Sequence, residues 1–481
     1  MAFILVAPFH NLLSHSRFLL TLRSSEGIYH SLILFRLTSG PSENFEQEAS
    51  PNASDAQLYA MEAQCPHLGA DISHADIEEC EDSVVLVCPW HRYDFDLRTG
   101  YSETGLRACT YALEIRKDER DVDTVWVETP AGGMEWRIVE LRPVSEEFAD
   151  PPPPPLDLSH LSISAKEEPN GPPEDIVPTS GAPTTLIQWA VVILNTADPS
   201  LKVQRTRHAV NLFRTGQLKS IGHRVSNPPQ PPDVPPREDL YSKNTVDPSK
   251  VGKRKNRPVM LHALANIEQW AIDLAWDIIA RFGPLHPDLP PAFFSDFTKV
   301  ALDESKHFSL LTARLSAISP STPYGSMPVH ASLWDSARTT FSSLRARLAI
   351  IHLVHEARGL DVNPGTIERF RRQGDDESVK VLEIIHADEV THVTAGHRWF
   401  TWLCEKQGVD PVNTFREEVR RGWTGDVKGP FNVEAREKAG MTRDFYENLR
   451  GESKWGNTNS PVPPVPTEVA AEKEIAYETQ H

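Results

Sequence analysis

Two short loops of the sequence each carry one cysteine and one histidine. Cys65 and His67 flank a proline in AQCPHLGA, and Cys88 and His91 lie in VCPWH. If the loops face each other, they can supply two thiolates and two imidazoles to one metal site. Such a set can bind zinc, but zinc fingers usually pair cysteine with cysteine and histidine with histidine along the chain. One of each per loop favours a 2Fe-2S cluster, in which both cysteines bind one iron and both histidines bind the other.

A second set of candidate ligands lies in the C-terminal half, in two segments that repeat the order Asp-Glu-x-x-His. The segments are LDESKH, with Glu304 and His307, and ADEVTH, with Glu389 and His392. A Glu and a His three residues apart share one face of a helix, and both pairs lie among apolar residues at helical spacing. A carboxylate that faces a core must be compensated by hydrogen bonds or by a cation.

Two further glutamates, Glu268 and Glu356, lie at core-facing positions of their own helical segments. The order along the chain is therefore Glu, Glu-x-x-His, Glu, Glu-x-x-His, which is the ligand plan of a dinuclear iron or manganese site in a four-helix bundle. Two divalent cations would balance the four negative charges. Glu383 and His386 share the spacing but lack the preceding Asp, and we interpret this pair as a coincidence.

The aspartates that precede the two ligand glutamates have an expected role of their own. Ligand histidines usually donate their second ring N–H to a carboxylate. We therefore expect Asp303 to contact His392 and Asp388 to contact His307 across the bundle. The alternative is a degenerate site, in which hydrogen bonds alone join these polar residues.

The rest of the sequence predicts an α+β multidomain protein that positions these residues. Short runs with strand alternation fill residues 28–132 and predict an all-β domain. A Pro-rich linker follows at 147–183, where PPPPP and the polar residues after it cannot form a core. Helical periodicity predicts an all-α domain at 184–450, and the composition of residues 451–481 predicts a disordered tail.

Residues 1–27 are expected to form an N-terminal extension. The first 25 residues contain no Asp or Glu and include Arg17 and Arg23, a composition shared by organelle transit peptides. Two interpretations therefore stay open, an irregular extension and a mitochondrial targeting segment.

Composition narrows the classes of partner and compartment. The chain has 49 Lys plus Arg against 67 Asp plus Glu, a net charge of -18, which argues against a surface that follows nucleic-acid phosphates. The five cysteines are too sparse for a disulfide scaffold and favour an intracellular, cytoplasmic location. No apolar run is long enough to span a membrane. No nicotinamide or flavin fingerprint occurs, which implies an external reductase or ferredoxin.

The first pair of loops resembles a known family. CPHLG, then CPWH and an aromatic-rich strand, is similar to a Rieske iron-sulfur domain of the ferredoxin and oxygenase branch, whose loops are not joined by a disulfide. The resemblance implies a 2Fe-2S cluster that carries one electron at a time. Arg92 departs from the family, which usually has Gly at this position.

The helical half resembles a second family. The stretches HALANIEQWAIDLAWD, HEARGLDVNPG and ADEVTHVTAGHRWF are similar to an uncharacterised ferritin-like family that is distantly related to a tRNA hydroxylase. The resemblance implies a ferritin-like four-helix bundle with a di-iron centre. In it, one histidine would bind each metal, and the four glutamates would share terminal and bridging roles.

Together these features predict an oxidoreductase in which a Rieske cluster passes electrons to a di-iron carboxylate site. Such a protein would be a non-haem iron monooxygenase or oxidase with a small-molecule substrate. One alternative is a non-catalytic electron-transfer or iron-binding module, and another is a Rieske protein with a degenerate bundle. A homo-oligomer also stays open. A mobile linker would not fix the cluster near the bundle of its own chain, and electrons could then pass between neighbouring chains.

Overall fold

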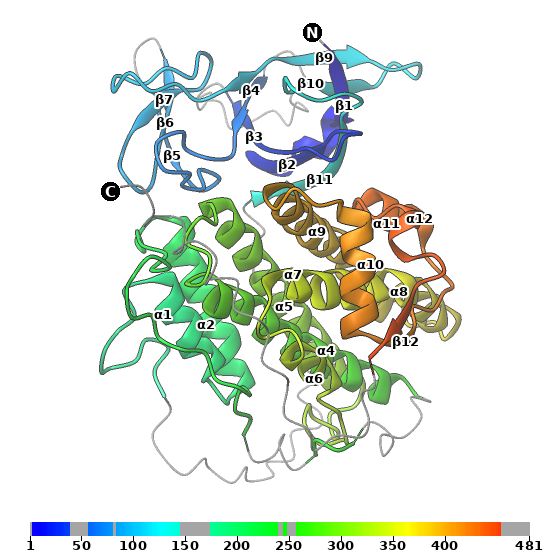
Figure 1. Cartoon of the computed structure of the whole chain (residues 1–481). Helices are drawn as coiled ribbons and strands as arrows, with labels where there is room; N and C mark the ends of the chain where they lie inside the picture. The colour runs from blue at the N-terminus through cyan, green and yellow to red at the C-terminus, as the bar shows by residue number, and fades with distance from the viewer. Residues whose placement is uncertain are drawn as a thin grey trace, which may run out of the picture.

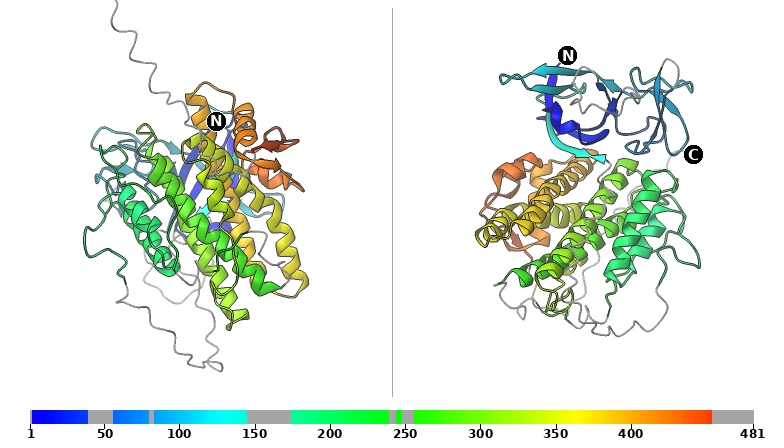
Figure 2. Two further views of the ribbon diagram at one scale, coloured as in Figure 1. Left: turned by 60° about the horizontal axis from the view of Figure 1, so that its bottom comes forward. Right: turned by 180° about the vertical axis from the view of Figure 1, so that it is seen from behind.

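The computed structural model describes residues 2–38, 56–79, 83–144, 174–238, 244–247 and 256–453. A layer of β-sheets lies on one end of a larger helical layer (Figure 1), and the view from behind in Figure 2 has the same arrangement. The predicted α+β organisation is confirmed, with the strands first along the chain and the helices after them. None of the described helices is long and apolar enough to cross a membrane.

Within the described residues, the β layer consists of three antiparallel sheets. One has the order β1-β10-β9, the second β11-β2-β3-β4-β8, and the third β5-β6-β7. The strands are β1 (Phe3–Pro8), β2 (Arg17–Arg23), β3 (Tyr29–Thr38), β4 (Ala56–Glu62), β5 (Asp76–Glu79), β6 (Val84–Val87), β7 (Asp94–Asp96), β8 (Thr110–Tyr111), β9 (Leu113–Lys117), β10 (Asp123–Glu128) and β11 (Arg137–Pro143).

The N-terminal residues differ from the extension that we expected at 1–27. β1 pairs with β10, and β2 lies between β3 and β11, so both strands belong to the sheets. The reason is local: Phe18, Leu20 and Leu22 alternate along β2 and are buried, which requires a partner surface. The β11 strand likewise lies beyond residue 132, where we expected the β domain to end.

The predicted linker and tail fall mostly outside the described residues. Of the linker expected at 147–183, residues 174–183 are described, and Glu174 there accepts a 2.6 Å hydrogen bond from the buried Arg205. Of the tail expected at 451–481, residues 451–453 are described, and β13 (Arg450–Glu452) pairs with β12 (Thr424–Asp426). A short strand therefore lies where we expected the disordered tail to begin.

The described α-helices lie between residues 186 and 446. They are α1 (Leu186–Leu194), α2 (Pro199–Arg214), α4 (Arg257–Asp277), α5 (Pro291–Ile318), α6 (Ser332–Arg338), α7 (Leu344–Ala349), α8 (Glu356–Arg372), α9 (Asp376–Lys406), α10 (Pro411–Gly422), α11 (Val433–Lys438) and α12 (Arg443–Tyr446). Two π-helical segments, η6 (Ile278–Phe282) and η7 (Ile350–His355), extend α4 and precede α8. Such segments often occur at functional sites.

The long helices α4, α5, α8 and α9 position the candidate ligands. Capping sets where they begin: Asn256 accepts from the backbone of Val259 at the start of α4, and Asp375 accepts from that of Ser378 at the start of α9. The α4 helix packs on α5, and α8 packs on α9. Each helix buries an apolar stripe, so the carboxylates within those stripes must find compensation inside the bundle.

Candidate metal centres

Two loops of matching geometry carry the first set of candidate ligands. One follows β4 and holds Cys65, and the other follows β6 and holds Cys88. Each loop is closed by a backbone hydrogen bond to its cysteine carbonyl, from Gly69 at 2.8 Å in the first and from Arg92 at 2.9 Å in the second. A second bond, from the cysteine N–H to Ala70 or to Tyr93, is 2.8 Å in both. The sequence repeat of the loops is thus also a structural repeat.

The four side chains separate into a sulfur pair and an imidazole pair. Cys65 and Cys88 are buried and hydrogen-bond each other, which raises the pKa of Cys65 and lowers that of Cys88. The rings of His67 and His91 lie 4.6 Å apart between centroids, and His91 is exposed. Among the described residues, the buried Nδ1 of His67 has no hydrogen-bond partner. This donor set fits a binuclear cluster with sulfur on the inner iron and nitrogen on the outer one.

Arg92, the departure from the expected glycine, has a structural account. Its φ is 59°, in the left-handed region that favours glycine. Its guanidinium donates to Asp76 at 2.7 Å and to Glu78 at 3.2 Å, both on or beside the neighbouring strand β5. The second loop therefore keeps the backbone that a glycine would adopt, and ion pairs hold the arginine in place.

The second set of candidate ligands converges inside the bundle. In the described part of the chain, two groups of side chains each bring their ligand atoms within 4.8 Å of one another. The groups are Glu268, Glu304, His307 and Glu389, and Glu304, Glu356, Glu389 and His392. Glu304 and Glu389 belong to both groups, which suits bridging carboxylates, whereas each remaining glutamate and histidine belongs to one. All six predicted residues are thus brought together, and all but the half-buried Glu356 are buried.

Both histidines present the same nitrogen to the carboxylates. Nδ1 of His307 lies 3.2 Å from Glu304, and Nδ1 of His392 lies 3.1 Å from the other oxygen of Glu304. The opposite nitrogen, Nε2, lies 3.0 Å from Asp388 in His307 and 3.3 Å from Asp303 in His392. Both predicted aspartate contacts are therefore present, and each leaves Nδ1 directed at the centre of the site.

The polar atoms at the centre fit a pair of cations. Among the described residues, Glu304 Oε1, Glu389 Oε2 and His392 Nδ1 are buried and lack a hydrogen-bond partner of acceptable geometry. Burial and the neighbouring Glu304 raise the pKa of Glu268 well above its usual value, and burial and Glu389 do the same for Glu356. Ionised together, these carboxylates would repel one another, and two divalent cations remove that cost.

Both halves of the chain are similar to known proteins. Residues 195–447 match the family described as "Protein of unknown function (DUF455)", which is more than half of the chain. This chain belongs to the DUF455 family. A relative described as an uncharacterized protein of Haemophilus influenzae is 34% identical over 226 residues, which are 44% of this chain and 77% of that protein.

The N-terminal part of this DUF455 protein carries a Rieske-type domain. Residues 48–109 match the family described as "Soluble Rieske-type ferredoxin". A human protein described as "Rieske domain-containing protein" is 39% identical over 44 residues, 9% of this chain and 28% of that protein. The Rieske-type domain supports a 2Fe-2S cluster and an electron-transfer role.

A solved structure gives a more distant likeness. The putative NADH-dependent nitrite reductase small subunit from Mycobacterium tuberculosis aligns with 27% of this chain and 97% of its own length. The identity is 15% and the TM-score is 0.20, values that support no conclusion about this chain.

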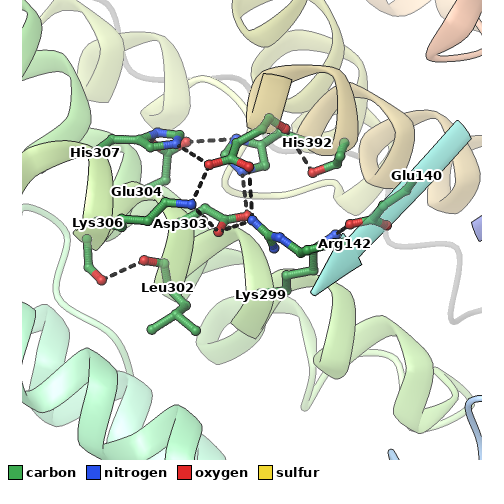
Figure 3. A network of polar contacts seen from close by, with 12 residues as sticks. Glu140, Arg142, Lys299, Leu302, Asp303, Glu304, Lys306, His307 and His392 are labelled. Carbon is green, nitrogen blue, oxygen red and sulfur yellow. Dashed lines mark hydrogen bonds and ion pairs between the residues drawn. The ribbon is translucent and has the colours of Figure 1, made fainter. Parts of the chain in front are cut away.

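Two cations beside the bundle site were not found from the sequence. Arg142 of β11 donates to Asp303 and, at 3.0 Å, to Asp388, while Lys306 lies 2.6 Å from Asp388. Figure 3 shows Arg142 and Lys306 approaching Asp303 from opposite sides. Lys306 follows Asp303 by three residues and could have been found from helical spacing. No sequence pattern linked Arg142 to the site, because it lies in the Rieske-type layer, far from Asp303 along the chain.

The Glu383 and His386 pair is outside the bundle site, as the missing aspartate suggested. Glu383 is exposed and accepts a 2.9 Å hydrogen bond from Arg371. His386 belongs to neither group of converging ligand atoms. It lines an open cavity of about 660 Å³ between β11, α9 and α11.

The cluster loops contact the DUF455 region directly. A Cβ added at Gly69 would lie 3.2 Å from Cγ of Pro291, in the first turn of α5. A Cβ added at Gly216, just after α2, would lie 2.4 Å from the carbonyl oxygen of Pro89. The rings of Trp90 and Phe213 pack with centroids 5.8 Å apart. These close approaches fix both cluster loops against the ends of two bundle helices.

Proposed function

We propose that this chain is a two-centre redox protein that uses dioxygen to oxidise or hydroxylate a small molecule. A 2Fe-2S cluster on Cys65, His67, Cys88 and His91 would supply single electrons to a dinuclear iron or manganese centre. The proposed ligands of that centre are Glu268, Glu304, His307, Glu356, Glu389 and His392.

The observation that carries the proposal is the convergence of six ligand side chains from four helices. A degenerate bundle has no reason to keep four carboxylates and two imidazoles around one buried point. Hydrogen bonds alone leave several of these atoms without partners, as described for Glu304, Glu389 and His392. Buried carboxylates without compensation are costly, so the arrangement favours a bound pair of cations.

The docked cluster loops support transfer within one chain. Helix α5 begins against Gly69 and carries Glu304 thirteen residues after Pro291, which is about 20 Å along a helix. Ring side chains fill part of that distance, since Phe293 and Phe297, and then Phe297 and His352, have centroids 4.8 Å apart. These contacts keep the cluster loops against α5, so an oligomer is not needed to bring the two centres together.

The protein's own residues would divide the remaining work. Bound metals would act as Lewis acids and as redox centres toward dioxygen. Asp303 and Asp388 keep Nε2 of each histidine protonated and Nδ1 available. The exposed ring of His91 gives an external reductase or ferredoxin access to the cluster.

Single-turnover oxygen consumption tests this function. The full chain is loaded anaerobically with Fe(II), reduced chemically and mixed with dissolved oxygen. We expect rapid oxygen uptake and loss of the reduced-cluster signal in the wild type, and neither rapid phase in Glu304→Ala. Glu383→Ala, on the same bundle but exposed and outside the ligand groups, serves as the control and should behave as the wild type.

Other outcomes would point to other functions. If the bundle binds two metals but oxygen uptake is as slow as in Glu304→Ala, the chain is an electron-transfer or iron-binding module. If the bundle binds no metal at all, the proposal is wrong and only the Rieske-type electron-transfer role stays.

A further inference from the structure

The strand β11 lies between the Rieske-type layer and the bundle (Figure 1). It pairs with β2, with Thr21 opposite Glu140 and Leu19 opposite Arg142. Side chains alternate along a strand, so Leu141 packs in the β core while its two neighbours face the helices. The backbone of β11 therefore pairs within the sheet, while its charged side chains contact the bundle.

Two ion-pair systems join β11 to the bundle. Glu140 pairs with Lys299 of α5, and Thr21 donates to the other oxygen of Glu140 at 2.9 Å. Arg142 pairs with Asp303 and Asp388, on α5 and α9. Figure 3 shows the two systems side by side on the same strand. Only the second of them contacts residues that hold the ligand histidines.

The oxygens of the two aspartates are divided in the same way. Asp303 uses Oδ1 for Arg142 and Oδ2 for Nε2 of His392. Asp388 likewise uses Oδ1 for Arg142, at 3.0 Å, and Oδ2 for Nε2 of His307, at 3.0 Å. A single guanidinium therefore fixes both carboxylates, and each carboxylate fixes one histidine. Both candidate ligand histidines are therefore connected, each through one aspartate, to Arg142 of the Rieske-type layer.

Removal of that guanidinium would leave two aspartates with insufficient compensation. The side chain of Asp303 is 3% exposed and that of Asp388 is 13% exposed, so water screens them weakly. Lys306 contacts Asp388 at 2.6 Å but lies 3.7 Å from Asp303, so its ammonium is close to one aspartate, whereas Nη2 of Arg142 donates to both. The carboxylates would turn toward the cavity between β11 and α9 and release the histidines.

We propose that Arg142 is a positioning residue that couples docking of the Rieske-type domain to metal binding in the bundle. This proposal rests on the function proposed above. Docking of β11 brings the guanidinium to both aspartates, which orient both histidines. Metals bound to the histidines would in turn hold the aspartates in the position that Arg142 contacts. By thermodynamic linkage the coupling is reciprocal: metal should tighten the docking of β11 as much as docking tightens metal.

The test compares Arg142→Gln with Lys299→Met in the full chain. Each variant removes one cation from the same interface, and the two side chains are similarly buried, at 12% and 10% exposed. Fe(II) alone is titrated anaerobically into metal-free protein and the free metal is measured with a colorimetric chelator. Loss of an outer partner of a ligand histidine typically weakens metal affinity about 10- to 100-fold. We expect that loss in Arg142→Gln and wild-type affinity in Lys299→Met.

Arg142→Lys tests whether a positive charge at position 142 restores part of the Fe(II) affinity, which a purely structural role of the side chain would not require. A lysine keeps the positive charge, but its side chain is one atom shorter than that of Arg142, whose Nη2 contacts both aspartates. The Fe(II) affinity of Arg142→Lys should therefore lie between those of the wild type and Arg142→Gln. If Arg142→Gln fails to fold, Arg142→Lys against Lys299→Met decides the question. Equal Fe(II) affinities in these two variants would overturn the proposal, as would wild-type affinity in Arg142→Gln.

Hydrogen exchange supplies a readout that does not depend on activity. Amide protection of residues 137–142 should increase on Fe(II) binding in the wild type and in Lys299→Met, and should not increase in Arg142→Gln. The absorption of the cluster should stay unchanged in all of these variants. A wild type whose bundle binds no Fe(II) would refute the proposed function itself, whereas normal binding without the Arg142 effect would refute only this coupling.

Discussion

Gly69 of the first cluster loop packs against Pro291 in the first turn of α5. A Cβ at Gly69 would lie 3.2 Å from Cγ of Pro291, and the φ of Gly69 is +72°. The residue thus meets two demands at once, a left-handed backbone and a close approach between the domains. The contact joins the loop that holds Cys65 and His67 to the helix that holds Glu304.

We predict that Gly69→Val slows electron transfer to the bundle without loss of the cluster. A side chain in the left-handed region costs about 1–2 kcal/mol, and the added atoms must also push the loop away from α5. The check is the rate at which the reduced cluster is reoxidised when Fe(II)-loaded protein is mixed with oxygen.

A matched control separates the contact from the backbone cost. Gly105 has a φ of +83° and no heavy atom within 4 Å of an added Cβ. Gly105→Val should therefore lower stability by a similar amount but keep the wild-type rate. Equal slowing in both variants would contradict the role assigned to the contact with Pro291.

Loss of one thiolate should remove the cluster and spare the bundle. In Cys88→Ala, we expect the visible absorption to disappear and the iron content to fall by the two irons of a 2Fe-2S cluster. Fe(II) binding by the bundle should persist, because the two sites share no ligand. Cys109 is exposed, and Cys109→Ala should retain the colour and the iron. Cluster iron retained in Cys88→Ala would refute the proposed ligand set.

At position 92 the structure predicts an order of stability among three side chains. Arg92→Ala keeps the left-handed strain and loses the ion pairs with Asp76 and Glu78, whereas Arg92→Gly removes the strain. We expect Arg92→Gly to be more stable than Arg92→Ala by about 1–2 kcal/mol. The wild type should lie between Arg92→Ala and Arg92→Gly, since exposed ion pairs contribute about 0–1 kcal/mol. Urea denaturation checks the order, and Arg92→Ala as the most stable form would contradict it.

Buried His262 should make the protein sensitive to acid. Burial lowers the pKa of His262 to about 4, and its Nε2 accepts a 2.9 Å hydrogen bond from the backbone of Gly325. The folded protein keeps this ring neutral at pH values where the unfolded chain binds a proton. Its contribution to stability is therefore complete above about pH 6.5 and is lost as the pH falls toward 4.

The acid effect can be measured on His262→Gln, which retains an acceptor but cannot bind a proton. Between pH 7 and pH 5, the wild type should lose about 2 kcal/mol more stability than this variant. Urea midpoints at the two pH values give the difference. His10 is exposed, and His10→Gln should follow the wild type. Parallel losses in the wild type and His262→Gln would show that this ring does not bind the proton.

The sequence alone determined which side chains were candidates for metal binding. Tight loops place Cys65 beside His67 whatever surrounds them, and a helix places Glu304 beside His307 by its own geometry. The aspartate contacts followed from the same local rule, because a ligand histidine needs a partner for its second nitrogen. Local sequence patterns also predicted that strands come first along the chain and helices after them.

The tertiary structure decided how those candidates are connected. Glu304 and Glu389 prove to be the shared carboxylates only once four helices are packed together, and Arg142 reaches Asp303 only because β11 is the edge strand against α5 and α9. The strand at 3–8 was missed for the same reason, since its partner β10 lies more than a hundred residues away. The strand at 17–23 has a nearby partner in β3, but its other partner, β11, is equally distant along the chain. Such pairings are set by which surfaces bury one another, and spacing along the chain does not contain that information.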